Sequence, residues 1–158
     1  MEEHIISLTV EDRFGMLARI AGLFSARGYN INSLVVATTE DPSVSRLVLT
    51  VSGDQPIIEQ IMKQLNKLIG VIKTIDLNEG KYLERELVLV KVENNTQKRS
   101  EVLKLVELYR GLVIDVTSKY LMVEAMGESH QIDGLLVALR PYGLKEVVRT
   151  GKVAIGRE

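Results

Sequence analysis

Apolar side chains along this chain follow either a strand-like or a helix-like spacing, and the same order of strand-like and helix-like segments occurs twice. Between residues 4 and 77 apolar side chains follow the period of two typical of strands or the 3.6-residue period typical of helices. Their order is strand, helix, strand, strand, helix, strand, and residues 84 to 155 repeat it. This is the order of the ferredoxin-like βαββαβ unit, whose two helices cover one face of a four-stranded antiparallel sheet. We therefore predict an α+β chain with two ferredoxin-like domains in tandem.

The expected elements set the domain boundaries. In the first half, strands are predicted at residues 4–10, 31–37, 44–52 and 71–77, with helices from Met16 to Gly28 and over 55–68. In the second half, strands are predicted at residues 84–93, 112–117, 120–126 and 143–155, with helices over 97–109 and 129–139. A polar, glycine-containing stretch separates the halves, so we expect domains at 1–78 and 84–158 joined by a linker at 79–83.

A ferredoxin-like sheet has helices on one face only, so the other face is expected to be bare. An uncovered apolar face usually marks an interface. The fold therefore predicts a protein partner or a homo-oligomer.

The segment 11–33, EDRFGMLARIAGLFSARGYNINS, contains one amphipathic helix with a distinctive residue at each end. Gly28 is suited to end the helix in a left-handed conformation, and Asn30 follows just before the next strand. Gly15 precedes the helix and leaves room for another molecule near the amides of Gly15, Met16 and Leu17. With the positive end of the helix dipole, these amides form a weak anion site suited to a carboxylate; the alternative is a plain turn.

Composition excludes several classes of function. Lys and Arg number 20 against 21 Asp and Glu, so nothing indicates a nucleic-acid or membrane surface. The absence of cysteine excludes disulfides, thiolate nucleophiles and cysteine zinc sites. No apolar run approaches the roughly 18 residues of a membrane span, and the acidic start is unlike a signal peptide, so we expect a cytoplasmic protein.

The sequence is poor in catalytic chemistry. Its two histidines, His4 and His130, have no spacing typical of a metal site or a triad, and we expect both at the surface. The carboxylates at 2–3 and 11–12 are expected to be solvated, and no phosphate-binding glycine loop is present. We predict no catalytic and no metal-binding residues.

Binding of a small zwitterion is the function that the remaining features favour. An amino acid needs donors for its carboxylate, acceptors for its ammonium group and a pocket for its side chain. The amides of Gly15 to Leu17 supply the donors, while Asn30, the Ile31 backbone and the Asp12 carboxylate are candidate acceptors. Aliphatic neighbours would favour valine, leucine or isoleucine. They are Leu17, Ile31, Leu34 and Val35.

Residues 11–51 resemble the regulatory small subunit of acetolactate synthase (acetohydroxyacid synthase). The matching segments include RIAGLFSARGYNI, SRLVLTV, IEQIMKQLNKLIGVIK and ERELVLVKV, and also GLVIDVTSKYLMVEAMG and TGKVAIGRE. The resemblance covers nearly the whole chain. It extends into the second half, which generic ACT domains, the family of small amino-acid-binding modules, do not share.

The resemblance implies an amino-terminal ACT domain that pairs with a second copy and binds valine, or another branched-chain product, at the dimer interface. It also implies a catalytic large subunit that carries thiamine diphosphate, FAD and magnesium, none of which belongs to this chain. The family's effector contacts fall on Asp12, Gly15, Met16, Leu17, Asn30 and Ile31. Two positions depart from the pattern, because Asp12 is commonly asparagine in the family and Phe14 stands where ACT domains often have proline.

Other readings make different predictions. An ACT-domain sensor of another enzyme or of a transcription system would not associate with a thiamine-dependent large subunit. A small stand-alone enzyme on this fold would show turnover as an isolated chain. A purely structural adaptor would tolerate Gly15→Asp without loss of inhibition.

Overall fold

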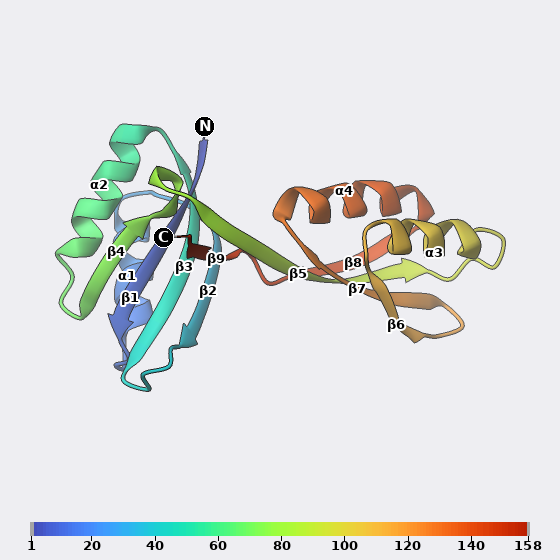
Figure 1. Cartoon of the computed structure of the whole chain (residues 1–158), viewed down its shortest axis with the longest axis horizontal. Helices are drawn as coiled ribbons and strands as arrows, with labels where there is room; N and C mark the ends of the chain where they lie inside the picture. Colours follow the sequence, from blue (N-terminus) through green and yellow to red (C-terminus); the bar gives the residue numbers. More distant parts are fainter. Residues whose placement is uncertain (1, 158) are drawn as a thin grey trace. The chain divides into compact units, whose positions relative to one another are not determined.

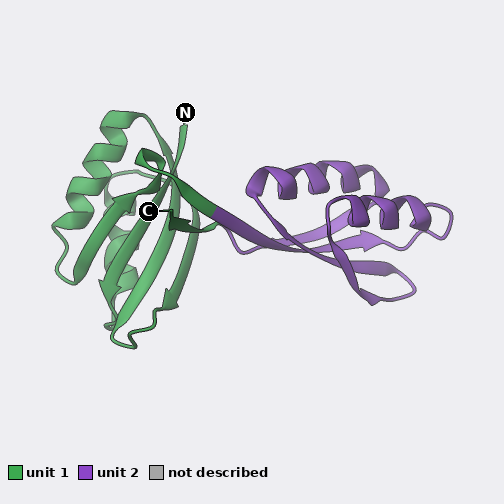
Figure 2. Ribbon diagram, in the orientation of Figure 1, with its two compact units in different colours: residues 1–83, 152–158 green, residues 84–151 purple. Residues whose placement is uncertain are grey.

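The computed structural model describes residues 2–157, and these form two compact units (Figures 1 and 2). The first unit contains residues 2–83 and 152–157, and the second contains residues 84–151. Each unit has its own antiparallel sheet and its own hydrophobic core. The two predicted βαββαβ units are therefore confirmed.

The first unit is a four-stranded sheet with two helices on one face (Figure 1). Its sheet order is β2-β3-β1-β4, so β2 and β4 are the edges. The elements in chain order are β1 (Glu2–Glu11), α1 (Met16–Ala26), β2 (Ile31–Thr38), β3 (Val44–Gly53), α2 (Gln55–Asn66), β4 (Val71–Asp76) and the short 3₁₀ helix η1 (Leu77–Glu79).

The main core of this unit lies between the sheet and the helices. Side chains of alternate residues in β1 point to the same face of the sheet. On that face Ile6, Leu8 and Val10 pack with Ile20 of α1 and Ile61 of α2. All five are nearly inaccessible to solvent. The strand and helix periods seen in the sequence thus meet in one apolar layer, whose burial is the main source of the unit's stability.

The opposite face of this sheet is not bare, which corrects the prediction for the first domain. Ile5, Val48 and Leu77 form a second buried cluster there, and Tyr82 and Ala154 pack against it. The prediction failed because a strand-helix pattern shows which side chains are apolar but not which distant segment will cover them.

Ala154 belongs to a strand from the far end of the chain. This strand, β9 (Val153–Gly156), pairs with β5 (Tyr82–Glu93). The backbone amide of Arg157 donates to the carbonyl of Lys81 at 2.8 Å. Residues 152–157 therefore join the first unit, whereas we expected 84–158 to form the second domain. The expected linker at 79–83 contains the end of η1 and the start of β5.

The second unit repeats the architecture with sheet order β6-β7-β5-β8. After β5 its elements are α3 (Arg99–Leu108), β6 (Leu112–Val116), β7 (Tyr120–Gly127), α4 (Ser129–Leu139), the 3₁₀ helix η2 (Arg140–Tyr142) and β8 (Leu144–Arg149). The predicted last strand at 143–155 is thus two strands, β8 and β9, with the break at residues 150–152.

The outer face of the second sheet exposes large apolar side chains, as predicted for a bare face. Leu87 and Met126 lie opposite each other on β5 and β7, and Leu89 lies opposite Val148 of β8. These four side chains are 38 to 66% exposed.

Three glycines end or follow helices in the left-handed region, with φ of 70° at Gly28, 97° at Gly70 and 87° at Gly143. After α3, however, Arg110 takes this conformation with φ 58°, although glycine is the usual residue at such a position. Gly111 serves a different purpose. A Cβ there would meet the Glu124 carbonyl at 3.0 Å, so the chain needs a glycine for close packing against β7.

Candidate functional site

The turn into α1 is built around Gly15, which adopts a left-handed conformation with φ 85° and ψ −4°. No side chain caps the helix start, and a Cβ at Gly15 would meet nothing within 4 Å. The turn is therefore open to an incoming molecule, as predicted. One of the three predicted donors is already engaged, however, because the Met16 amide donates to the Arg13 carbonyl at 3.3 Å. Met16 itself is 5% exposed, while Leu17 is 46% exposed.

Asp12 lies at the start of this turn, where its backbone amide donates to the Ser43 carbonyl at 2.8 Å. Its carboxylate accepts a hydrogen bond from the Ser45 hydroxyl at 3.2 Å. The neighbouring Phe14 side chain is fully exposed, which is unusual for an aromatic ring. A carboxylate and a free ring thus flank the open amides.

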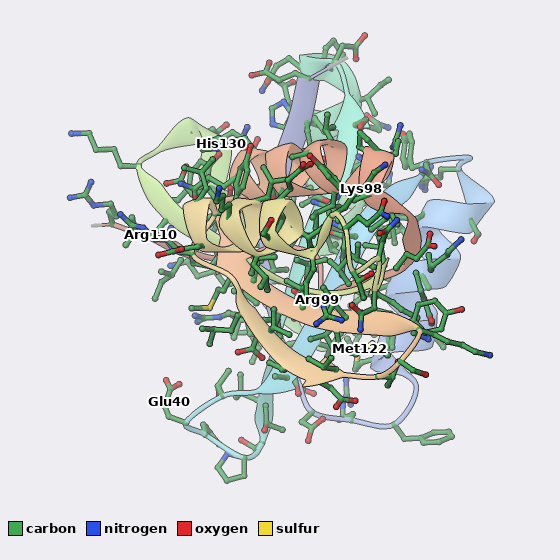
Figure 3. The ribbon with its side chains drawn as sticks, turned by 90° about the vertical axis from the view of Figure 1, so that its right-hand side faces the viewer. Glu40, Lys98, Arg99, Arg110, Met122 and His130 are labelled. Atoms are coloured by element: carbon green, nitrogen blue, oxygen red, sulfur yellow. The ribbon has the colours of Figure 1, made fainter. Side chains whose placement is uncertain are left out.

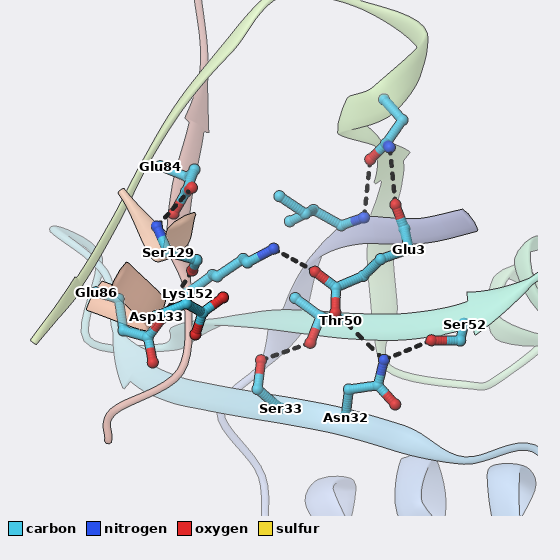
Figure 4. A network of polar contacts seen from close by, with 12 residues as sticks. Glu3, Asn32, Ser33, Thr50, Ser52, Glu84, Glu86, Ser129, Asp133 and Lys152 are labelled. Atoms are coloured by element: carbon cyan, nitrogen blue, oxygen red, sulfur yellow. Dashed lines mark hydrogen bonds and ion pairs between the residues drawn. The ribbon is translucent and has the colours of Figure 1, made fainter. Parts of the chain in front are cut away.

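Asn30 lies at the other end of α1, just before β2. Its side-chain amide donates to Asn32 at 3.3 Å, and Asn32 in turn donates to the Ser52 hydroxyl at 2.7 Å. Figure 4 shows Asn32 between Ser52 and Glu3, to whose carboxylate it also donates at 3.3 Å. Ile31 is half-buried and packs against the main core.

Asn32 is a polar residue that sequence analysis did not single out. It links Asn30 to the sheet, so it sets the direction of the Asn30 amide. The signal available in the sequence was a second asparagine two residues after Asn30. Strand alternation alone does not predict the direction of its side chain, because the β2–β3 register shifts between Ile31 and Ser33.

The two groups of candidate residues lie far apart within one chain. Register places Ile31 on a row with Val51 and His4, at one end of the sheet. Glu11 ends β1 at the opposite end and leads into the Gly15 turn. The 11 residues of α1 separate the turn from Asn30 by roughly 16 Å at 1.5 Å per residue. An amino acid is too small to touch both groups in one chain.

The histidines differ from each other in their surroundings. His130 is on the surface, as predicted, with an exposed ring 3.3 Å from the Glu128 carboxylate (Figure 3). His4 is only 5% exposed, so the prediction of a surface position was wrong. Its Nδ1 lies 2.9 Å from an Asp76 oxygen, across 72 residues of sequence. A satisfied buried pair of this kind is a structural feature.

Residues 2–157 contain no group of three or more histidine, cysteine or acidic side chains arranged to hold a metal ion. No helix in this range has the length and apolar content that a membrane span requires.

A ferredoxin-like sheet with an open glycine turn before its first helix, followed by a second unit of the same topology, defines a chain of the ACT-domain regulatory class. The comparisons with known proteins are specific. Residues 6–73 match the ACT domain described as "AHAS small subunit-like", and residues 85–158 match the family described as "Small subunit of acetolactate synthase".

Full-length relatives carry the same description. The acetolactate synthase small subunit of Mycobacterium leprae is 46% identical over 98% of this chain and 91% of its own length. That of Aquifex aeolicus is 42% identical over 100% of this chain and 83% of its own. The solved acetolactate synthase small subunit of Thermotoga maritima is 38% identical, with a TM-score of 0.88 over 100% of this chain and 99% of that one. The chain belongs to the family of acetolactate synthase small subunits, and as such is a regulatory, non-catalytic chain.

Proposed function

We propose that this chain binds a branched-chain amino acid, valine in the first place, and thereby controls and activates the catalytic large subunit of acetolactate synthase. Family membership implies the large subunit as partner. Thiamine diphosphate, FAD and magnesium would belong to that subunit. The proposed amino-acid site consists of Asp12, Gly15, Met16, Leu17, Asn30 and Ile31.

The observation that carries this proposal is the separation of Gly15 from Asn30. Thr38, at one end of the β2 edge strand, shares a row with Ser45 and Val10, near the Gly15 turn. Ile31, at the other end, follows Asn30. Antiparallel pairing of two β2 edges around a two-fold axis would set Asn30 of one copy beside the Gly15 turn of the other. The residues that are divided within one chain would then form two equal sites in a dimer.

The chemistry of such a composite site suits an aliphatic amino acid. The free amides at the start of α1 would hold the ligand carboxylate, aided by the helix dipole. The Asn30 side-chain oxygen and the Asp12 carboxylate would accept from its ammonium group. Leu17, with 46% of its surface exposed, would contact the aliphatic side chain.

Control of the large subunit would follow from the position of this site between copies. A ligand held by two copies favours the pairing geometry that binds it better, and a partner attached to both copies experiences that difference. The ligand would therefore act by differential affinity for two assembled states.

Calorimetric titration of the chain with valine, and with leucine, isoleucine and threonine for comparison, tests the proposal. We expect saturable valine binding that is abolished by Gly15→Asp, which places a carboxylate at the anion site, and by Asn30→Ala. Glu40→Ala, an exposed change on the β2–β3 turn, serves as a control that leaves binding unchanged.

A mixed dimer makes the test specific for a shared site. Gly15→Asp and Asn30→Ala chains, co-expressed with different tags and purified through both, would contain one intact site per dimer, about half the wild-type number. Absence of binding in the mixed dimer, with binding in the wild type, would contradict a site divided between copies. Absence of heat with the wild type and all four amino acids, also after addition of the large subunit, would contradict amino-acid binding.

A further inference from the structure

A groove of about 530 Å³ lies in the first unit on the sheet face opposite α1 and α2. Its lining residues come from β1, β3 and β4, from η1 and the residues around it, and from β9. We call it the basic groove and define it by Thr9, Arg46, Lys73, Ile75, Lys81 and Ile155. None of these residues belongs to the candidate amino-acid site.

Two cations flank a hydroxyl group on one row of this sheet. Thr9 of β1 lies opposite Arg46 of β3 on one side and opposite Lys73 of β4 on the other. Directly opposed residues of antiparallel strands point to the same face, so all three side chains face the groove. Lys81 adds a third positive charge from the start of the segment beyond η1. Like charges gathered in this way repel each other unless an anion lies between them.

The charges of the groove are not balanced within residues 2–157. None of the side chains of Arg46, Lys73 and Lys81 forms an ion pair with a residue in that range. Of the two acidic residues in the lining, Asp76 is 6% exposed and is held by His4 and by the Asn78 amide. Glu79 lies on the exposed rim.

The surplus of positive charge is confined to the groove, because the whole chain has a formal net charge of −1. The same groove exposes aliphatic surface, with Ile75 39% and Ile155 59% accessible. Cations beside exposed isoleucines suit an occupant that has both carboxylates and apolar side chains, which a protein segment provides and a simple ion does not. β4 is an edge strand, so a segment can approach along it.

We propose that the basic groove binds an acidic segment of the large subunit, with carboxylates against Arg46, Lys73 and Lys81 and an apolar side chain against Ile75 and Ile155. This inference rests on the proposed function, which supplies the large subunit as partner. It adds the surface through which that partner is held and the charge by which it is recognised.

The test is association of the full-length chain with the large subunit of the same organism, measured by biolayer interferometry over a range of salt concentrations. Arg46 and Lys73 are both exposed, so the double variant Arg46→Glu with Lys73→Glu is expected to fold. We expect its Kd to rise at least tenfold and the dependence of Kd on salt to become weaker. The control variant is Lys63→Glu with Lys67→Glu, two exposed positions on α2 or just after it. It changes the net charge by the same amount on the other face of the sheet, so its Kd should equal that of the wild type.

Valine titration and sedimentation of each variant separate the outcomes. Weaker large-subunit binding with valine binding and self-association intact supports the proposal, and the milder pair Arg46→Gln with Lys73→Gln should show a smaller loss of the same kind. Unchanged Kd and salt dependence in the double reversal would overturn it. Loss of self-association in the absence of the large subunit would assign the groove to a second copy and would also overturn it. Failure of the wild-type chain to bind any large subunit would instead overturn the proposed function, and this inference with it.

Discussion

Arg149 of β8 holds the buried carboxylate of Glu86 on β5 through two nitrogen–oxygen contacts. Its Nε pairs with one Glu86 oxygen, and its Nη2 donates to the other at 2.9 Å. The Ser129 hydroxyl, at the start of α4, donates to the same carboxylate at 2.7 Å. Asp133 of α4 lies 2.8 Å from the remaining Arg149 nitrogen. The hydrogen bond to Glu86 is the main reason that the pKa of Arg149 is raised. Helix and sheet of the second unit are thus joined through one carboxylate.

Arg149→Ala is predicted to destabilise the second unit. The Glu86 side chain is 4% exposed, so its charge would be left in a poorly solvated position. We expect a loss of about 3 kcal/mol in the free energy of unfolding, the low end for breaking a buried pair because the Arg149 side chain is 34% exposed. Urea denaturation measures this loss. Lys145→Ala, an exposed change on the same strand, is the control, and equal effects of the two variants would contradict the prediction.

Lys91 and Glu146 provide a pH-dependent contribution on the outer face of the second sheet. Their side chains are 2.8 Å apart, and the hydrogen bond to Lys91, followed by its charge, lowers the pKa of Glu146. A depressed folded-state pKa contributes stability above the unfolded pKa and loses it as pH falls through the folded pKa. The stability advantage of the wild type over Glu146→Gln should therefore shrink between about pH 5 and pH 3.

Urea midpoints of wild type and Glu146→Gln, measured at several pH values, test this expectation. Glu107→Gln, an exposed change on α3, should show no such pH-dependent difference. A stability difference for Glu146→Gln that is constant from neutral to acidic pH would rule out the pair as its source.

Gly70→Ala is predicted to disturb the turn beneath the proposed amino-acid site. Gly70 has φ 97°, and a Cβ there would lie 2.7 Å from the Met16 sulfur and 2.8 Å from an Arg13 nitrogen. Backbone strain alone costs about 1–3 kcal/mol, and the contact with Met16 adds to it. Gly22→Ala, inside α1 with nothing within 4 Å of the new Cβ, should instead stabilise the unit by roughly 0.5–1 kcal/mol. Thermal unfolding of both variants tests this expectation, and shifts in Tm of the same sign would contradict the prediction.

Ala154→Asp is predicted to destabilise the first unit, although position 154 follows the whole second unit in the sequence. Ala154 packs against the buried cluster of Ile5, Val48 and Leu77. A carboxylate there would be partly desolvated and would disrupt the packing of this apolar cluster, at a cost of about 1–3 kcal/mol. Val153→Asp, at a position that is 46% exposed, is the matched control. Hydrogen exchange of the β1 amides should increase in the first variant only; unchanged protection would show that β9 does not stabilise the sheet.

Local pattern was enough to predict most of the architecture. Alternating and 3.6-residue periods placed the helices and the strands before β8 to within a few residues, because side-chain burial on a strand or helix follows its own geometry. Glycine was informative where the backbone must be left-handed, as at Gly28. At Arg110 the same rule failed, because the neighbouring Gly111 is required for contact with β7, a segment that the local pattern does not reveal.

The sequence by itself determined the two βαββαβ units, the open turn at Gly15 and the family that they indicate. Only the tertiary structure decided that β9 returns to cover Ile5 and that His4 is buried against Asp76. The reason is physical: periodicity reports the interaction of a residue with its own element, whereas these two facts depend on contacts between residues that are remote along the chain.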